Sequence, residues 1–141
     1  MEQKLSADEI AAFLNEVFPG AMENFKIEEV SPMHARIRMP FQTRQLRPGG
    51  TISGPSLMAL ADTGLWVALL AMIGREALSV TSHLDIDFLR KPAAADVIAD
   101  TVLHKLGKRL AVGTVLMYSD GEEMPCARAS VTYAIPSSYR A

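Results

Sequence analysis

The most informative stretch of this sequence reads SGPSLMALADTGLWVALLAMIG and spans residues 53–74. Ser53 or Gly54 suits the N-cap of a helix, and Pro55 suits its first turn, where a missing N–H costs no hydrogen bond. The stretch runs without interruption to Gly74 and is apolar on nearly every helical face. A helix that is hydrophobic all round has to be surrounded by protein, so the sequence predicts a long, buried central helix.

Alternating apolar residues predict six strands around this helix. On the first strand after the helix, Val80 and Phe88 are expected on the same side, together with Leu84 and Ile86. The last four strands are expected to form a meander, with a tight connection at Gly107-Lys108 and a hairpin signal at Asp120-Gly121. The six predicted strands are Lys26–Val30, Ala35–Met39, Ser79–Leu89, Asp96–Leu106, Arg109–Tyr118 and Met124–Ile135.

The N-terminal segment Leu5–Phe18 predicts a short amphipathic helix, because Ser6 and Glu9 can form a capping box at its start. Together these elements predict an α+β fold. A curved antiparallel sheet of five to six strands wraps round the central helix in one domain over residues 1–141. A sheet of this size covers only one side of the helix. The remaining apolar surface predicts a homodimer at least, and favours a homotetramer built as a dimer of dimers.

Composition argues against several classes of protein. The chain of 141 residues has a formal net charge of -2, which gives no basic surface for nucleic acid and no polybasic membrane patch. Its most apolar stretch, Leu57–Ile73, is short for a membrane span and contains Asp62, so we interpret it as a buried helix. The one cysteine, Cys126, allows no internal disulfide and suits a reducing, cytoplasmic location. The three histidines lack metal-like spacing, so neither a metal nor a cofactor is expected.

Asp62 is out of place in the central helix. Its neighbours are leucine, methionine, alanine and tryptophan side chains, and an unpaired buried charge is costly. The carboxylate therefore has to be hydrogen-bonded, protonated or open to a cleft. In one interpretation Asp62 bonds Thr63 or a backbone amide and only fixes the packing. In the other it is a catalytic carboxylate.

The start of the helix is the second candidate. Backbone N–H groups point outward there, and Gly54 lets a substrate carbonyl approach its amide closely enough to form an oxyanion hole. Ser53-Gly54-Pro55 could also be no more than a good cap. From Gly54 to Asp62 the helix rises about 12 Å. One helix cannot easily bring both groups to one carbon atom, whereas a symmetric dimer with antiparallel central helices can.

Residues 47–69, RPGGTISGPSLMALADTGLWVAL, and 81–93, TSHLDIDFLRKPA, resemble the signature of hotdog-fold thioesterases. The resemblance is to the phenylacetate-degradation and hydroxybenzoyl-CoA thioesterase type, and it extends over about Phe25–Ile135. Members usually have a His-Gly-Gly opening and an acidic residue eight positions after its first glycine. Gly54 and Asp62 keep this spacing, so the resemblance implies a hotdog fold.

The resemblance also implies a role for each matching position. Asp62 would be the general base or the nucleophile, the Gly54 amide would polarise the thioester carbonyl, and Thr81 would orient the attacking water. The residues implied to contact the CoA phosphates are Arg90, Lys91 and, as weaker matches, Lys108 and Arg109.

Some positions depart from the family pattern. Ser53 replaces the usual His, and Pro55, which has no N–H to donate, replaces the second Gly. Where relatives often have an Asn, an ungapped alignment puts Arg47, with Gln45 close by, and either could bind the carbonyl or its water. The expected substrate-binding residues are Arg47, Ser53 and Trp66, the last as part of an acyl pocket.

Taken together, the resemblance implies an acyl-CoA thioesterase that acts on a small or medium-sized acyl group, aromatic groups included. Its site would be built across a dimer. A non-catalytic acyl-CoA-binding protein is the alternative, which the altered Ser53-Gly54-Pro55 opening leaves open. A hotdog hydratase or dehydratase is disfavoured, because no His lies in the central helix or its leading loop.

Overall fold

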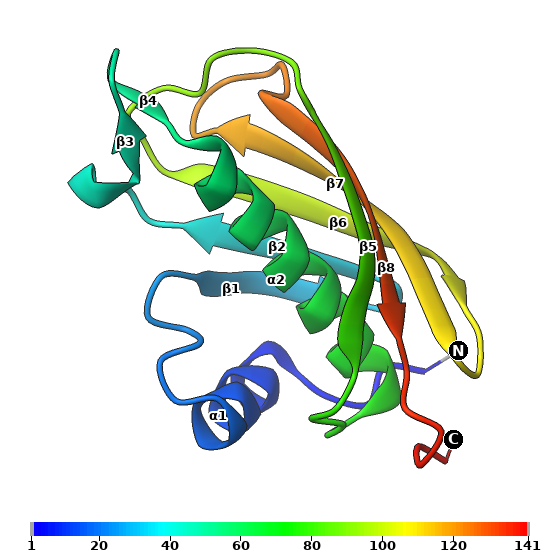
Figure 1. Ribbon diagram of the computed structural model, residues 1–141. Helices are drawn as coiled ribbons and strands as arrows, with labels where there is room; N and C mark the ends of the chain where they lie inside the picture. Colours follow the sequence, from blue (N-terminus) through cyan, green and yellow to red (C-terminus); the bar gives the residue numbers. More distant parts are fainter. Residues whose placement is uncertain (1, 141) are drawn as a thin grey trace.

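Helix α2 (Gly54–Ile73) lies in the concave face of a curved, six-stranded antiparallel sheet in the computed structural model, which describes residues 2–140 (Figure 1). The sheet order is β1-β2-β6-β7-β8-β5, and a small second sheet pairs β3 with β4. The other elements are α1 (Ala7–Val17), β1 (Lys26–Ser31), β2 (His34–Met39), the 3-10 helix η1 (Thr43–Gln45), β3 (Leu46–Arg47), β4 (Thr51–Ile52), β5 (Val80–Phe88), β6 (Val97–Leu106), β7 (Leu110–Ser119) and β8 (Ala127–Ala134).

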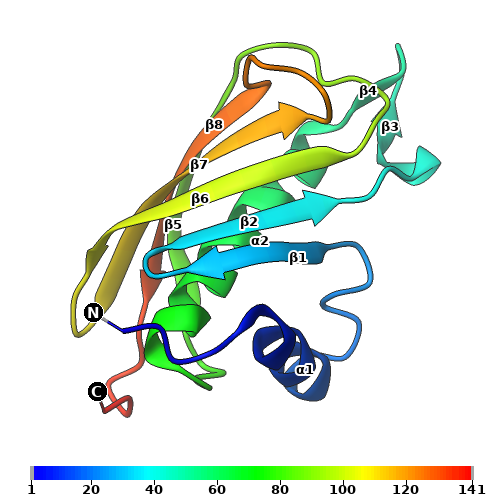
Figure 2. The same cartoon turned by 180° about the vertical axis from the view of Figure 1, so that it is seen from behind.

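This arrangement confirms the predicted α+β hotdog architecture, with a long central helix, a six-stranded antiparallel sheet and a short N-terminal helix. The capping box of α1 is present, because Ser6 Oγ accepts from the Glu9 amide and Glu9 accepts from the Ser6 amide. In Figure 2 the convex side of β2, β6 and β7 faces the viewer, and α1 lies beyond β1 at the edge of the sheet. The predicted domain bounds include Met1 and Ala141, which lie outside the described residues.

One prediction of connectivity is wrong. The last four strands are not a simple meander, because β5 pairs with β8 at the sheet edge while β6 pairs with β2. The connection over residues 89–96 is long enough to carry the chain across between these two places. The hairpin predicted at Asp120-Gly121 is present, because β7 pairs antiparallel with β8. Its second strand begins at Ala127 and not at Met124, so residues 120–126 form the loop.

Helix α2 has the predicted caps and is mostly buried. The Ser53 side chain accepts a hydrogen bond from the Ser56 amide, and Gly74 ends the helix with φ 92°. By length and composition the helix could cross a membrane, but 67% of its apolar window is buried inside the fold, as in a core helix. One face stays open to solvent: Met58 is 41% exposed, and Asp62 and Trp66 lie partly exposed along the same face.

Gly113 in β7 allows α2 to lie close to the sheet. A Cβ atom added there would lie 2.5 Å from the Val102 carbonyl oxygen and 2.6 Å from Leu65 Cδ1. We expect Gly113→Ala to lower the free energy of unfolding by about 1–3 kcal/mol, because overpacking shifts backbone and helix. Urea denaturation measures this loss. Gly107→Ala is the control, since its nearest contact would be 3.4 Å away, and an equal loss there would contradict the prediction.

Candidate active site

Asp62 lies on the open face of α2 and accepts two hydrogen bonds at one carboxylate oxygen. Thr81 Oγ1 donates to Asp62 Oδ1 at 2.5 Å, and the Tyr133 hydroxyl donates to the same atom at 2.9 Å. The Tyr133 hydroxyl also lies 3.3 Å from the backbone carbonyl oxygen of Asp62. Within residues 2–140, no hydrogen bond reaches Oδ2. The carboxylate is therefore fixed through one oxygen and keeps the other available.

A β-bulge in β5 brings Thr81 to this carboxylate. Thr81 pairs with Tyr133 on β8, but His83 already pairs with Thr132, so Ser82 is an extra residue. The bulge changes which residues of β5 face α2. Thr81 precedes the bulge in the chain, and its side chain faces the helix.

Beyond the bulge, β5 turns a different set of positions toward the core. Leu84 pairs with the fully buried Val131, and the next inward residue is Ile86. The expectation that Val80 shares this inward side is wrong, because the extra residue turns Val80 outward, where it is 59% exposed.

Tyr133 is the site residue that sequence reasoning missed. Its side chain is only 3% exposed, although its hydroxyl reaches Asp62. Burial raises the pKa of the Tyr133 hydroxyl, and the neighbouring Asp62 carboxylate raises it further. The hydroxyl therefore stays protonated and acts as a donor. Its cross-strand partner Thr81 could have pointed to it, but only once the β5–β8 pairing was known.

Gly54 lies apart from the Asp62 carboxylate, at the start of α2. It borders a cavity of about 670 Å³ between the β3–β4 hairpin and the segment that follows β5. As the first residue of the helix, Gly54 has an N–H group with no intrahelical acceptor. The Phe88 ring lies beside it, so that a Cβ atom at Gly54 would come within 3.2 Å of Phe88 Cζ. Other residues around this cavity include Arg47, Thr51, Ile52, Leu57, Arg90 and Lys91.

The structure distinguishes Arg47 from Gln45, the two candidates for the role of the Asn that relatives often have in this loop. Arg47 lines the same cavity as Gly54. Gln45 is buried, and its side chain donates to the Pro40 carbonyl oxygen and accepts from the Gln42 amide. Gln45 therefore stabilises the loop, whereas Arg47 borders the cavity.

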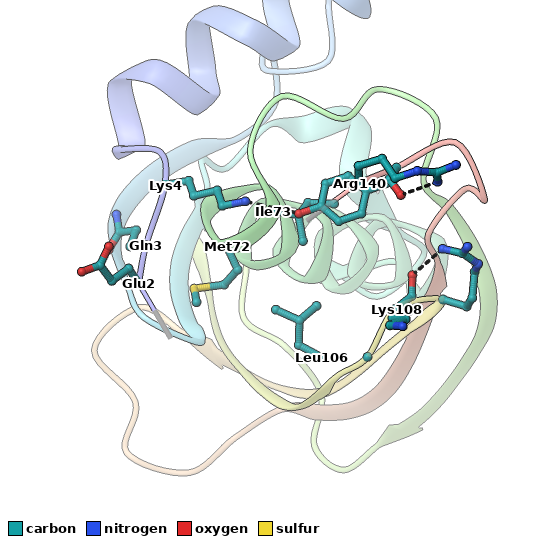
Figure 3. A pocket seen from close by; sticks show the side chains of 11 residues that line it. Glu2, Gln3, Lys4, Met72, Ile73, Leu106, Lys108 and Arg140 are labelled. Carbon is teal, nitrogen blue, oxygen red and sulfur yellow. Dashed lines mark hydrogen bonds between the residues drawn. The ribbon is translucent and has the colours of Figure 1, made fainter.

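The four predicted CoA-binding cations lie in two groups. Arg90 and Lys91 border the Gly54 cavity, and Arg90 donates to the Pro125 carbonyl oxygen at 2.8 Å. Lys108 and Arg109 lie at the other end of α2, beside a cavity of about 820 Å³ (Figure 3). The floor of this cavity includes Met72, Ile73 and Leu106, and Lys4, Tyr139 and Arg140 from the chain ends border it. A helix of 20 residues, roughly 30 Å long, lies between the two groups.

The remaining candidates have structural contacts of their own. Ser53 caps α2, and its hydroxyl lies 2.9 Å from the Ser56 hydroxyl. Trp66 lies one turn beyond Asp62, and its ring centroid is 6.2 Å from that of Phe18. Its buried indole N–H has no acceptor within residues 2–140. Over the same range, no group of three His, Cys, Asp or Glu side chains could hold a metal ion.

The candidate site therefore consists of two parts in one chain. Asp62, Thr81 and Tyr133 form a carboxylate with two hydroxyl donors. Gly54, Arg47, Arg90 and Lys91 form a cationic cavity around a helix N-terminus. A carboxylate of the first kind can activate water or attack an acyl carbon, and a helix amide of the second kind can stabilise an oxyanion.

Comparisons with known proteins identify the family of this chain. Residues 49–126 match the thioesterase superfamily. The structure is similar to that of a candidate thioesterase from Silicibacter sp. TM1040, with 45% identity, a TM-score of 0.89, and coverage of 96% of this chain and 95% of that one. It is also similar to a mutant phenylacetic acid degradation protein from Thermus thermophilus, with 27% identity, a TM-score of 0.70, and coverage of 82% and 97%.

Among curated proteins, a candidate esterase from Thermoplasma acidophilum is 26% identical over 113 residues, which is 79% of this chain and 83% of that protein. The family match spans more than half of the chain and includes both Gly54 and Asp62. The chain belongs to the thioesterase superfamily, with the hotdog fold, and is a thioester hydrolase.

Proposed function

We propose that this hydrolase acts on acyl-CoA thioesters and releases a free acid and CoA, with Asp62 as the catalytic carboxylate. The observation that supports this best is the fixed carboxylate, whose Oδ1 is held by Thr81 and Tyr133 while Oδ2 accepts no hydrogen bond from residues 2–140. Oδ2 would take a proton from the attacking water, or would itself attack to form an anhydride that water then opens. Thr81 would hold the carboxylate and orient the water beside it.

The proposal includes a dimer, because one chain separates Gly54 from Asp62 by about 12 Å of helix rise. A second copy, related by a two-fold axis, would place its Gly54 amide near Asp62 of the first. The open face of α2 supports this arrangement, as does the edge strand β5, where Val80 is 59% and Phe88 is 54% exposed. An uncovered edge strand with apolar side chains is a surface that a partner strand stabilises.

The cavity beside Gly54 would hold the CoA moiety. Arg47, Arg90 and Lys91 surround it, and guanidinium and ammonium groups are the usual protein ligands of phosphate. Gly54 lies in the same cavity, so a thioester carbonyl could reach its amide while the phosphates meet the cations. Trp66, one turn beyond Asp62, would contact the acyl group. Lys108 and Arg109 remain predicted CoA contacts that would require a different approach of the nucleotide.

Two substrates with the same acyl group test the CoA assignment. Acyl-CoA carries the phosphates, whereas the N-acetylcysteamine thioester has none. We expect the double variant Arg90→Ala/Lys91→Ala to raise KM for acyl-CoA by about 10-fold to 100-fold, because charge-assisted hydrogen bonds are lost. Its KM for the N-acetylcysteamine thioester should not change. Thiol release, followed by absorbance with a thiol reagent, gives both constants.

The matched variant Lys108→Ala/Arg109→Ala removes two cations from the other end of α2. A larger rise of KM there than in the Arg90/Lys91 variant would move the CoA site to the cavity of Figure 3. No thiol release from any member of a panel of short, medium and aromatic acyl-CoAs would overturn the proposed substrate class. The ranking of kcat/KM across the panel identifies the acyl group.

A further inference from the structure

We propose that Tyr133 is a positioning residue that assigns the two oxygens of Asp62 to different tasks: Oδ1 is held, and Oδ2 reacts. This inference rests on the proposed function, in which Asp62 is the catalytic carboxylate. Tyr133 donates to Oδ1 at 2.9 Å, and Thr81 donates to the same atom at 2.5 Å. With two donors on one oxygen, the carboxylate cannot rotate without breaking both hydrogen bonds.

Tyr133 is better suited to this task than Thr81. It lies on β8, which has β7 on one side and β5 on the other, and its side chain is 3% exposed. Its hydroxyl lies within 3.3 Å of the Asp62 carbonyl oxygen as well, so it is anchored to both the backbone and the side chain of that residue. Thr81 lies on the exposed edge strand. We therefore infer that Tyr133 sets the orientation and that Thr81 completes it.

Few other ionisable groups face Asp62. Helix α2 contains no second charged residue. On β5, the ionisable residues beyond the bulge are His83, Asp85 and Asp87, which point away from the helix, and Arg128 of β8 pairs with Asp87 on that outer side. Among residues 2–140, Tyr133 is the ionisable side chain that hydrogen-bonds to Asp62. Substitution of Tyr133 should therefore change the pH profile of kcat/KM.

Tyr133→Phe tests the inference, because it removes the hydroxyl and keeps the ring. We expect the acidic limb of the kcat/KM profile to move to higher pH, because a hydrogen bond to the charged form of an acid favours that form. We expect kcat on the plateau to fall about 10-fold, because the reacting oxygen is less well oriented. KM should change little, since Tyr133 does not contact the CoA cavity.

Tyr118→Phe is the matched control, because the Tyr118 hydroxyl makes no hydrogen bond within residues 2–140 and lies on β7. Its pH profile should equal that of the wild type. A merely structural role for Tyr133 would lower stability in urea without moving the acidic limb, and an unmoved limb overturns the inference.

If Tyr133→Phe does not fold, fluorotyrosine at the tyrosine positions is the second measurement. A more acidic hydroxyl donates more strongly, so the limb should move to lower pH, and an unmoved limb again overturns the inference.

Failure of this inference and failure of the proposed function give different results. If Asp62→Asn retains wild-type kcat, the proposed function is wrong. If Asp62→Asn is inactive but Tyr133→Phe has a wild-type pH profile, the proposed function stands and the role of Tyr133 is refuted.

Discussion

Asp62→Asn should lower kcat by about 10²-fold to 10⁴-fold, because the amide can neither accept a proton from water nor attack the thioester. Asparagine has the size of aspartate, and its carbonyl oxygen can still accept from Thr81 and Tyr133, which now bond Oδ1. The variant should therefore fold. Thiol release from the best acyl-CoA measures kcat, and urea denaturation checks that the free energy of unfolding is kept.

Asp85→Asn is the control for this substitution. Asp85 lies on β5 beyond the bulge and pairs with Ser130 on the side of the sheet that faces away from α2. It carries the same charge but has no access to the site, so its kcat should equal that of the wild type. An Asp62→Asn enzyme with wild-type kcat would show that the carboxylate is structural and that another group activates water.

The parts of the fold that sequence predicted correctly depend on local chemistry. Helix α2 was predicted from its cap at Ser53, the proline that follows and the glycine at its end, all of which lie within one segment. The capping box of α1 likewise depends only on Ser6 and Glu9, which are three residues apart. Asp62 stood out for the same reason, because a charge among apolar neighbours is visible without knowledge of the fold.

The parts that sequence did not predict depend on contacts between distant segments. Strand β5 pairs with β8, which is three strands further along the chain, instead of with its sequence neighbour. The bulge at Ser82 reverses the alternation that placed Val80 inward, and no residue pattern marks a bulge. Tyr133 was missed because its role depends on that pairing and on that bulge together. The family resemblance implied the same CoA contact for Lys108 and Arg109 as for Arg90, yet they lie at the opposite end of α2.

Gly54→Pro should lower kcat by about 10²-fold to 10³-fold, because it removes the one backbone donor proposed for the oxyanion. Proline is well tolerated at the first position of a helix. The preceding Ser53 already has φ -71° and ψ 151°, which a following proline favours. Gly54→Ala is the matched control, since it adds a Cβ atom beside Phe88 and keeps the N–H group. If both variants lose activity equally, crowding of the cavity is the cause and the amide has no role.

Mixed dimers of two inactive variants test whether the site is shared between subunits. Asp62→Asn and Gly54→Pro chains with different affinity tags, co-expressed and purified through both tags, give dimers with one chain of each kind. In a shared site, the intact Gly54 of one chain meets the intact Asp62 of the other, while the second site carries both changes. The mixed dimer should then have about half of the wild-type activity, since one of two symmetric sites is restored. If each chain held a complete site, the mixed dimer would be as inactive as its parents. Restored activity would thus place the Gly54 amide of one subunit against the carboxylate of its partner.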